Sequence, residues 1–435
     1  MPSSTVISKS DSVLIVGAGV FGLSTALELT KRGYSSVTVV DRYLPPVADG
    51  SSVDISRVIR TDYADPLYAR MGREALRGWK TEYSAHYHES GFVMLASRKD
   101  GHPYLDKIRE VSKSVAVPLD EFEDAADVSR LFPAFQSRTD DLRASVNSAG
   151  GWADAEAAVR QLAMSCSAAG VSFVTGRAGT VTSLRYGADG AVIGVNVLSG
   201  GFVNADQVVL STGAWTNRLI GIEHTASASG QPVGFIQLTP EEADRLRGLP
   251  VIINFNSGVF VFPVTPGSNI LKVARHSYGF GTKVEVKEGE RAGAIVSSPK
   301  RDSNGAASSF LPEEAEQALR DGLSQLVPEF ASHPWSRKRL CWYTDTPEGD
   351  FIIDAHPTVK GLFLATGGAG HAFKFLPVLG KYVADCFENK APKEVRHQWR
   401  LRRPEGNGSK DMKPGDGSRG GPPLRVLSRL EQAKL

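Results

Sequence analysis

The sequence has few cysteines and no long apolar run. Cys166, Cys341 and Cys386 are the only cysteines among 435 residues, which excludes a disulfide framework and favours a reducing interior. No apolar stretch approaches the roughly 20 residues that span a bilayer. The polar start, MPSSTVISKSDS, lacks the apolar core of a signal peptide. We therefore expect no membrane association.

The chain also lacks an excess of charge and metal-binding spacings. Its 50 basic and 48 acidic residues give a net charge of +2, so nothing favours nucleic acid as a partner. No CxxC or HExxH spacing occurs, and we predict no metal site. The length and the 41% hydrophobic content predict two or three closely joined domains with a substantial core.

A glycine motif near the start predicts a dinucleotide site. Residues 13–22 read VLIVGAGVFG, an apolar helical pattern follows, and the next strand, VTVVD, ends at Asp41. Gly17 allows the tight turn, Gly19 lets the pyrophosphate approach the helix N-terminus, and Gly22 allows close packing. Asp41 is expected to accept hydrogen bonds from a ribose hydroxyl. This unit predicts binding of FAD or NAD.

Further along the chain, local signals predict several elements. Residues 66–84 read as an amphipathic helix, residues 91–97 as a strand, and residues 150–170 as a helix capped by Asp154. Residues 403–425 are rich in Gly, Pro, Ser and charge, which is typical of a disordered linker.

Six segments together resemble a known family. LIVGAGVFG, SRVIRTDY, LSTGAW, LKVARH, CWYTDTPEGDFIIDAHP and GGAGHAFKFLP occur in this order. The chain resembles the monomeric sarcosine oxidase family over about residues 10–390. The fungal branch of that family includes fructosyl amino acid oxidases (amadoriases), pipecolate oxidases and N-methyl amino acid oxidases. The CxYTxTP and GHxFK pieces are more specific than the glycine motif, and they favour FAD over NAD.

The resemblance implies roles for three residues that composition alone would leave unremarked. Cys341, otherwise an apolar filler of the core, matches the cysteine that carries FAD as a thioether. Arg60 and Lys374, otherwise two surface cations, match the pair that clamps the α-carboxylate of the substrate. Arginine offers a planar fork and lysine a point charge for that purpose.

Three catalytic candidates follow from the same resemblance. Lys272 lies in the apolar strand ILKVARH, and the alternation of a strand places Ala274 and His276 on its face. A buried lysine usually has a function; here it would stabilise superoxide as O2 takes its first electron. The alternative is a lysine at a sheet edge. Tyr343 is expected to donate a hydrogen bond into the same cavity, or else to be a core tyrosine.

The resemblance also implies a set of cofactor contacts beyond the glycine motif. Arg57 matches an arginine that the family keeps near the flavin ring. The residues expected beside FAD are Gly17, Gly19, Val20, Phe21, Gly22, Asp41, Arg42, Ser51, Arg57, Cys341, Gly370, Phe373 and Lys374.

His276 discriminates most among the possible substrates. Sarcosine-type oxidases resemble this chain in having a histidine there, whereas amadoriases have an acid. The segment Ser52-Val53-Asp54 lacks the histidines of the bacterial sarcosine oxidases, which predicts a roomier pocket and a side chain larger than that of sarcosine.

We therefore expect an α/β fold in which a Rossmann-type FAD domain of the glutathione reductase and D-amino acid oxidase type joins a substrate domain on a mixed, largely antiparallel sheet. The expected boundaries are 10–85, 150–230 and 335–395 for the FAD domain, 86–149 and 231–334 for the substrate domain, and 403–435 for a flexible tail.

The expected reaction oxidises the N–C bond of a secondary amino acid (N-methyl, N-alkyl or cyclic) to an imine, with O2 reduced to H2O2. An amadoriase, a dehydrogenase that passes electrons to a quinone, and a flavin-binding protein without turnover are alternatives. Lys272 argues against the second, and the retained Arg60, Lys272 and Lys374 argue against the third.

The end of the sequence suggests a cellular address. Ala433-Lys434-Leu435 resembles the S-K-L tripeptide that a peroxisomal import receptor binds. A peroxisomal location fits an enzyme that makes H2O2. We further expect a monomer whose partners are an amino acid substrate and O2.

Overall fold

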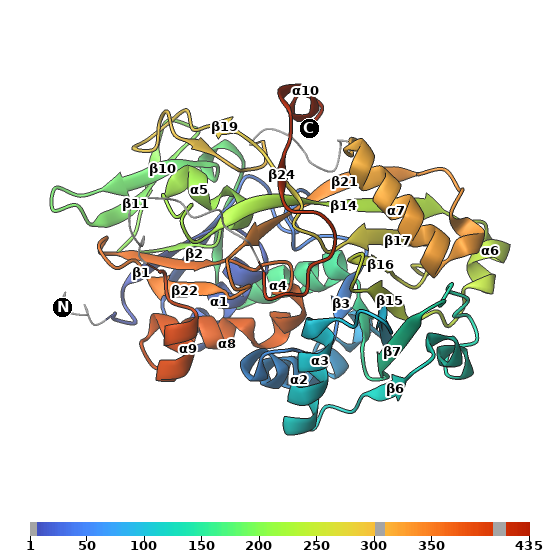
Figure 1. The fold of residues 1–435 in the computed structure, drawn as a ribbon. Coiled ribbons are helices and arrows are strands. Elements are labelled where there is room, and N and C mark those ends of the chain that lie inside the picture. The colour runs from blue at the N-terminus through green and yellow to red at the C-terminus, as the bar shows by residue number, and fades with distance from the viewer. Residues whose placement is uncertain (1–6, 301–308, 403–414) are drawn as a thin grey trace.

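The computed structural model describes residues 7–300, 309–402 and 415–435. Two large sheets organise the described chain (Figure 1): one of six strands, mostly parallel, and one of ten strands, mostly antiparallel. In spatial order, the six-stranded sheet consists of β22 (Ile352–Ala355), β23 (Leu362–Thr366), β13 (Gln207–Leu210), β1 (Ser12–Val16), β2 (Ser36–Val40) and β9 (Ser172–Val174).

The parallel sheet forms from apolar segments that are buried on both faces. Val13, Leu14, Ile15 and Val16 of β1 are all buried, as expected for a strand covered on both sides. The strand pairs in parallel with β2 and with β13. Helices α4 (Ala155–Ala168) and α8 (Leu376–Phe387) each pack against α1 (Val20–Lys31), which lies beside this sheet.

The second sheet contains strands from widely separated parts of the chain. In spatial order they are β24 (Arg425–Val426), β18 (Phe280–Gly281), β14 (Ser227–Gln237), β17 (Ile270–Arg275), β16 (Val259–Val261), β15 (Val251–Asn254), β5 (Phe92–Ser97), β7 (Leu142–Asn147) and β6 (Asp120–Phe122), with β21 (Arg337–Asp345) paired to β14. Helix α7 (Glu313–Leu326) contacts β14, β16 and β17 and buries its apolar face.

Smaller elements surround the two sheets. The short strands are β3 (Arg57–Ile59), β4 (Tyr87–Glu89), β8 (Gly151–Ala153), β10 (Val181–Tyr186), β11 (Val192–Val197), β12 (Phe202–Asn204), β19 (Val284–Glu285) and β20 (Ile295–Val296). The other helices are α2 (Pro66–Lys80), α3 (Pro103–Ser114), α5 (Thr216–Leu219), α6 (Pro240–Arg245), α9 (Lys393–Gln398) and α10 (Arg429–Gln432).

The predicted fold class is confirmed: a parallel nucleotide-type sheet adjoins a mixed, largely antiparallel one. The predicted helices are present as α2 and α4, and Asp154 caps α4 as expected. Residues 151–153, which were assigned to that helix, instead form β8. Strand β14 crosses the predicted boundary at residue 230 and pairs with β21, so both lie in the ten-stranded sheet.

The prediction of a flexible tail over residues 403–435 is wrong for the part that the structure describes. In Figure 1 the dark red C-terminal segment crosses the middle of the molecule and ends at α10. Arg419 and Leu427 are buried, and β24 pairs with β18. Residues 403–414, the rest of the predicted linker, lie outside the described residues.

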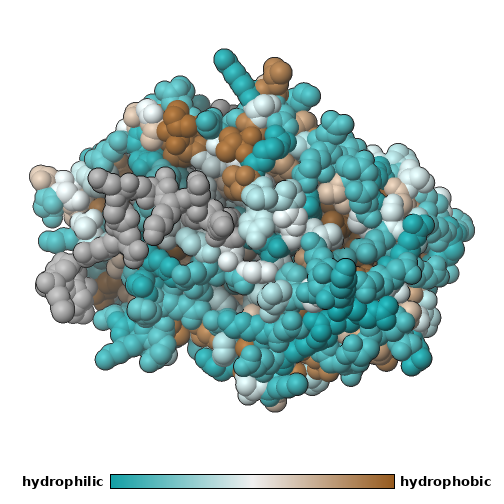
Figure 2. Space-filling model, in the orientation of Figure 1, coloured by the Kyte–Doolittle hydropathy of each residue, from teal (hydrophilic) through white to brown (hydrophobic). Residues whose placement is uncertain are grey.

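Within the described ranges, no helix is both long enough and apolar enough to cross a membrane. Figure 2 shows a mainly hydrophilic face with small hydrophobic areas.

Candidate active site

The turn between β1 and α1 has the geometry that the glycine motif predicts. Gly17 has a φ of +108°, and a Cβ there would lie 2.5 Å from the carbonyl oxygen of Ser211, so only glycine fits. The amide of Ala18 donates to Asp41 Oδ2 at 2.7 Å, and the amide of Val20 donates to Ser52 Oγ at 2.9 Å. The turn lies at the N-terminus of α1, whose helix dipole favours an anion.

Asp41 lies at the end of β2 as predicted. Besides the amide of Ala18, its carboxylate accepts from the amide of Arg42 at 2.6 Å. Burial raises the pKa of Asp41, and these amide donors oppose that shift. Each oxygen keeps a lone pair for another donor, so a ribose hydroxyl remains its predicted partner.

One recess, the nucleotide pocket, extends from this turn to the glycine-rich turn after β23. Of the predicted residues, it is lined by Gly17, Gly19, Val20, Phe21, Asp41, Arg42, Ser51, Arg57, Lys272, Cys341, Tyr343, Gly370, Phe373 and Lys374. Gly22 packs behind the turn, against Gly17. Arg60 and His276 lie outside the lining, next to residues that belong to it.

One face of β21 carries a row of functional side chains. Alternation puts Arg339, Cys341, Tyr343 and Asp345 on the same face of this strand. Cys341 is 5% exposed, and its Sγ lies 3.5 Å from Nη2 of Arg57. The thiol thus lies in the pocket wall, beside a fixed positive charge.

Asp54 is the centre of a buried charge cluster beside the pocket. Its Oδ2 lies 3.0 Å from Lys272 Nζ, 2.7 Å from Arg57 Nη1 and 3.0 Å from Arg339 Nη2. Although burial works the other way, Lys272, Arg57 and Arg339 hold the pKa of Asp54 well below its usual range. Asp54 therefore stays ionised and holds three cations beside the pocket.

Lys272 is as buried as the sequence predicts. The residue is 2% exposed, and its Nζ donates to the carbonyl of Ser56 at 2.7 Å. Burial lowers the pKa of Lys272 to about 7, and the Asp54 carboxylate opposes that shift. In neutral solution the side chain is therefore about half protonated, and the Asp54 ion pair favours the charged form.

Arg60 and Lys374 come together on one aromatic ring. The Arg60 guanidinium lies 4.2 Å from the centre of the Tyr63 ring, and Lys374 Nζ lies 5.6 Å from it. Arg60 also donates to Asp62 at 3.0 Å and to Tyr104 at 3.3 Å. Lys374 Nζ donates to the carbonyl of His371 at 3.0 Å.

These two cations have unused donor capacity. The guanidinium has five N–H groups and the ammonium three, more than those contacts use. Burial and the nearby Arg60 lower the pKa of Lys374, because two adjacent positive charges repel each other. An incoming carboxylate would relieve that repulsion, and Lys374 also lines the nucleotide pocket.

His276 lies just beyond the end of β17, between the pocket and the C-terminal segment. Its ring centre is 6.0 Å from that of Tyr343, which lines the pocket. On its other side, Nε2 lies 2.8 Å from Ser418 Oγ. Burial and the neighbouring Arg419 guanidinium lower the pKa of His276, so the imidazole is neutral.

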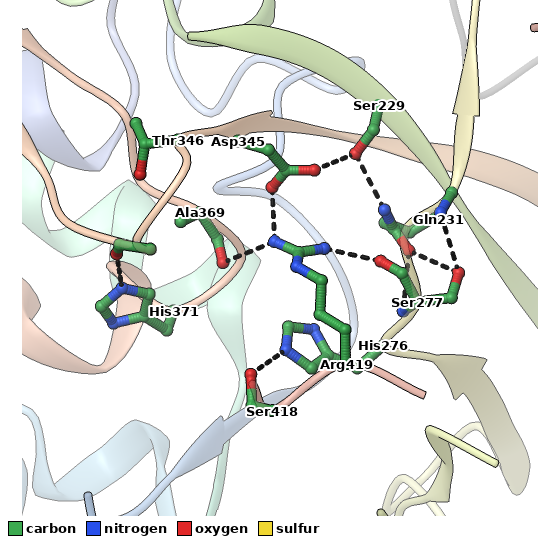
Figure 3. A network of polar contacts seen from close by, with 12 residues as sticks. Ser229, Gln231, His276, Ser277, Asp345, Thr346, Ala369, His371, Ser418 and Arg419 are labelled. Atoms are coloured by element: carbon green, nitrogen blue, oxygen red, sulfur yellow. Dashed lines mark hydrogen bonds and ion pairs between the residues drawn. The ribbon is translucent and has the colours of Figure 1, made fainter. Parts of the chain in front are cut away.

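Sequence reasoning missed the contribution of the C-terminal segment. Arg419 forms an ion pair with Asp345 and donates to the carbonyls of Ser277 and Ala369. Figure 3 shows this guanidinium at the centre of a polar network, with His276 beside it. Asp54 and Arg339 were also missed as members of the site, since neither belongs to a motif with a spacing signal.

The comparisons with known proteins agree with this geometry. Residues 12–386 match the family described as FAD dependent oxidoreductase. The chain is 30% identical to L-saccharopine oxidase of Schizosaccharomyces pombe, over 90% of this chain and 93% of that protein. It is 25% identical to monomeric sarcosine oxidase of an Arthrobacter species, over 87% of this chain and 92% of that protein.

A solved structure points the same way. Fructosyl amine:oxygen oxidoreductase (Amadoriase I) of Aspergillus fumigatus superposes with a TM-score of 0.80 at 30% identity, covering 92% of this chain and 91% of that chain. The chain belongs to the family of FAD-dependent oxidoreductases, and its resemblance to the sarcosine oxidases and their fungal relatives is confirmed.

The residues of the nucleotide pocket fit FAD. The Gly17 turn and the N-terminus of α1 suit the pyrophosphate, and Asp41 suits a ribose. At the far end, the thiol of Cys341 and the cations Arg57 and Lys272 lie where a flavin ring would follow in the same recess. Within the described part of the chain, no group of three or more His, Cys, Asp or Glu side chains is placed to hold a metal.

Proposed function

We propose that this protein oxidises the N–C bond of secondary amino acids, with N-methyl, N-alkyl or cyclic amines as substrates. O2 is the electron acceptor, and the products are an imine and H2O2. The observation that carries this proposal is the pair of buried cations, Arg60 and Lys374, on the ring of Tyr63 beside the nucleotide pocket.

The role of this pair is to bind and orient the substrate. An α-carboxylate placed between Arg60 and Lys374 would accept charge-assisted hydrogen bonds from both. It would thereby hold the α-carbon at a fixed place near the pocket lined by Lys374 and Tyr343. Such fixed placement is a proximity effect, and it makes the free carboxylate a requirement for turnover.

FAD, when bound, accepts a hydride from the substrate and passes two electrons to O2. Cys341 Sγ is the atom proposed to tether it, because the thiol lies in the wall of the same pocket. Lys272 is proposed to place a positive charge where O2 acquires negative charge. Tyr343 and His276 complete the set of catalytic candidates on the substrate side.

The secondary amine is the feature shared by the substrates named for the relatives. Saccharopine and sarcosine carry a secondary amine beside a carboxylate, and a fructosyl amine carries a secondary amine. His276, rather than an acid, follows β17 in this chain, which favours an N-alkyl or cyclic amino acid over a sugar-bearing one.

Deglycation of fructosyl amino acids is the second candidate. The C-terminal segment brings the carboxylate of Asp416 to Ser418, the hydrogen-bond partner of His276. An acid is therefore near the position where amadoriases have one, although it comes from another part of the chain.

A substrate panel decides between the two candidates. The full protein is incubated in air with an N-methyl amino acid, its primary-amine parent, a cyclic amino acid and a fructosyl amino acid, and H2O2 is measured. We expect turnover of the N-methyl or cyclic compound in preference to the other two. Preference for the fructosyl compound would transfer the assignment to deglycation, and preference for the primary amine would refute both.

We also propose that the protein is a monomer located in peroxisomes, through Ala433-Lys434-Leu435. Leu435 packs against the core beside the ten-stranded sheet, and Lys434 lies 5.4 Å from the Phe310 ring. A receptor must therefore release these last residues from the surface. Microscopy of the tagged full chain should show peroxisomal spots that disappear on deletion of Leu435; unchanged spots would contradict the address.

A further inference from the structure

The C-terminal segment from Gly415 to Gly421 is fixed beside His276 by buried contacts. Arg419 is 5% exposed and joins three separate places: Asp345 on β21, the carbonyl of Ser277 at 2.6 Å and the carbonyl of Ala369 at 3.2 Å. Removing one partner of such a buried ion pair is strongly destabilising, because it leaves the other charge buried and unpaired. The segment from Gly415 to Gly421 is therefore an integral part of the folded site.

The same segment holds His276 by its backbone and its side chain. The amide of Gly420 donates to the carbonyl of His276 at 3.1 Å. The imidazole Nε2 lies 2.8 Å from Ser418 Oγ (Figure 3). Ser418 Oγ in turn hydrogen bonds Oδ1 of Asp416. Three groups thus form one chain, from the imidazole through a hydroxyl to a carboxylate.

The direction of the hydrogen bonds in this chain follows from the number of protons. A carboxylate only accepts, and a serine hydroxyl has one proton to donate. Ser418 must donate that proton to Asp416, so it can only accept from His276. Nε2 of His276 therefore carries the proton, and Nδ1 carries the lone pair.

The surroundings of Asp416, Ser418 and His276 support the assignment of the proton to Nε2. Although burial works against ionisation, the two hydrogen bonds from Ser418 lower the pKa of Asp416. Asp416 keeps an exposed side, while Ser418 is buried. Within the described residues, no hydrogen bond to Nδ1 of His276 occurs, which leaves that nitrogen available.

We propose that Ser418 and Asp416 are positioning residues that hold His276 in the Nε2–H tautomer, so that Nδ1 accepts a proton from the substrate's ammonium group. In that step the N–H bond of the ammonium breaks and an Nδ1–H bond forms, and the substrate becomes the neutral amine. Ser418 and, through it, Asp416 stabilise the resulting imidazolium and oppose the repulsion from the neighbouring Arg419 guanidinium. This inference rests on the proposed function, since it needs an amine substrate.

Only the neutral amine can lose a hydride from its α-carbon. His276 must therefore present Nδ1, the nitrogen with the lone pair, to the ammonium group of the substrate. A positioned base typically contributes about 10²–10⁴ in rate, and a base held in the wrong tautomer loses part of that factor. Ser418→Ala removes the acceptor for Nε2–H and frees the ring to adopt the other tautomer. Ser418→Thr keeps a hydroxyl at the same place.

The test uses anaerobic stopped-flow mixing of the full holoenzyme with whichever secondary amino acid the wild type oxidises. We expect Ser418→Ala to lower the limiting rate of flavin reduction by up to about 10²-fold, part of what a positioned base contributes, with little change in the substrate dissociation constant. Ser418→Thr should recover most of the rate. Ser428→Ala is the matched control, because Ser428 caps α10 further along the chain, outside Gly415–Gly421, and should leave the rate unchanged.

A second readout is independent of activity. Nitrogen-15 spectra of histidine-labelled wild type, with the His276 signal assigned from His276→Asn, should show the Nε2–H tautomer, and Ser418→Ala should shift it toward Nδ1–H. The proposal is overturned by an Nδ1–H tautomer in the wild type, by an unchanged reduction rate in Ser418→Ala, or by an effect confined to the dissociation constant. If no secondary amino acid reduces the wild-type flavin, the proposed function fails, and the spectra still decide the tautomer.

Discussion

Denatured wild-type protein is expected to keep one FAD attached, and Cys341→Ala is expected to release all of it. The thiol lies in the wall of the nucleotide pocket, 3.5 Å from the guanidinium of Arg57, and it continues the row of β21 side chains that face this pocket. A thioether survives acid, whereas the hydrogen bonds of the Gly17 turn do not. Intact mass spectrometry after acid precipitation should therefore show the polypeptide plus one FAD.

The other two cysteines are the matched controls. Cys166 and Cys386 are buried in α4 and α8, outside the lining of the pocket. Cys166→Ala and Cys386→Ala should keep the added mass. Native Cys341→Ala should still bind FAD without a covalent bond, because the β1–α1 turn is unchanged. A wild-type mass equal to that of the bare polypeptide, with free FAD in the supernatant, would refute the linkage.

Replacement of Lys272 by Met is expected to slow reaction with O2 by about 10²–10³-fold, while the reductive half-reaction changes much less. The Lys272 ammonium is buried in the pocket wall and held in place by Asp54 and the carbonyl of Ser56. Such a charge is already oriented before O2 arrives, so it stabilises negative charge without reorganisation. Methionine keeps the approximate length of the side chain and removes the charge, together with the donors to Asp54 and to the carbonyl of Ser56.

Folding of this variant is protected by the rest of the cluster. Asp54 keeps Arg57 and Arg339 as partners, so no carboxylate is left unpaired. Lys390→Met is the control, since Lys390 pairs with Glu388 at the surface. Double-mixing stopped flow measures the two half-reactions separately. Normal reoxidation together with slow flavin reduction would assign Lys272 to the substrate side instead.

The parts of the site that the sequence predicted are those that local patterns define. The turn from Gly17 to Gly22 and the acid at Asp41 lie within one βαβ unit, where the spacing of residues sets the geometry. Cys341 and Tyr343 belong to one strand, so alternation puts them on one face. Arg60 and Lys374 were paired only through a family resemblance, because they meet on Tyr63 from segments far apart in the chain.

Local sequence patterns do not predict contacts between side chains that are far apart in the chain. Asp54, Lys272 and Arg339 come from three distant segments, and their contact depends on how β17 and β21 flank β14. No period in the sequence encodes that arrangement, so the partners of Lys272 could not be named in advance.

The C-terminal segment was wrongly predicted to be flexible because glycine and serine occur both in flexible linkers and where two backbones pack closely. The run GDGSRGG was interpreted as flexible, yet a Cβ on Gly420 would lie 2.3 Å from the amide nitrogen of Gly258. Glycine here permits close packing of two backbones. The arginine within the run, Arg419, was the only hint that the segment has a partner inside the protein.

The central claim is that Arg60 and Lys374 hold the carboxylate of the amino acid that this protein oxidises. Its most direct test compares an N-methyl amino acid with its methyl ester in anaerobic flavin reduction, using wild type, Arg60→Met and the surface control Arg130→Met. A charge-assisted hydrogen bond contributes roughly 1.5–3 kcal/mol, or about 10- to 150-fold in affinity. We predict that wild type and Arg130→Met prefer the acid by that factor and that Arg60→Met loses most of the preference. Equal reduction of the wild type by acid and ester would contradict the account.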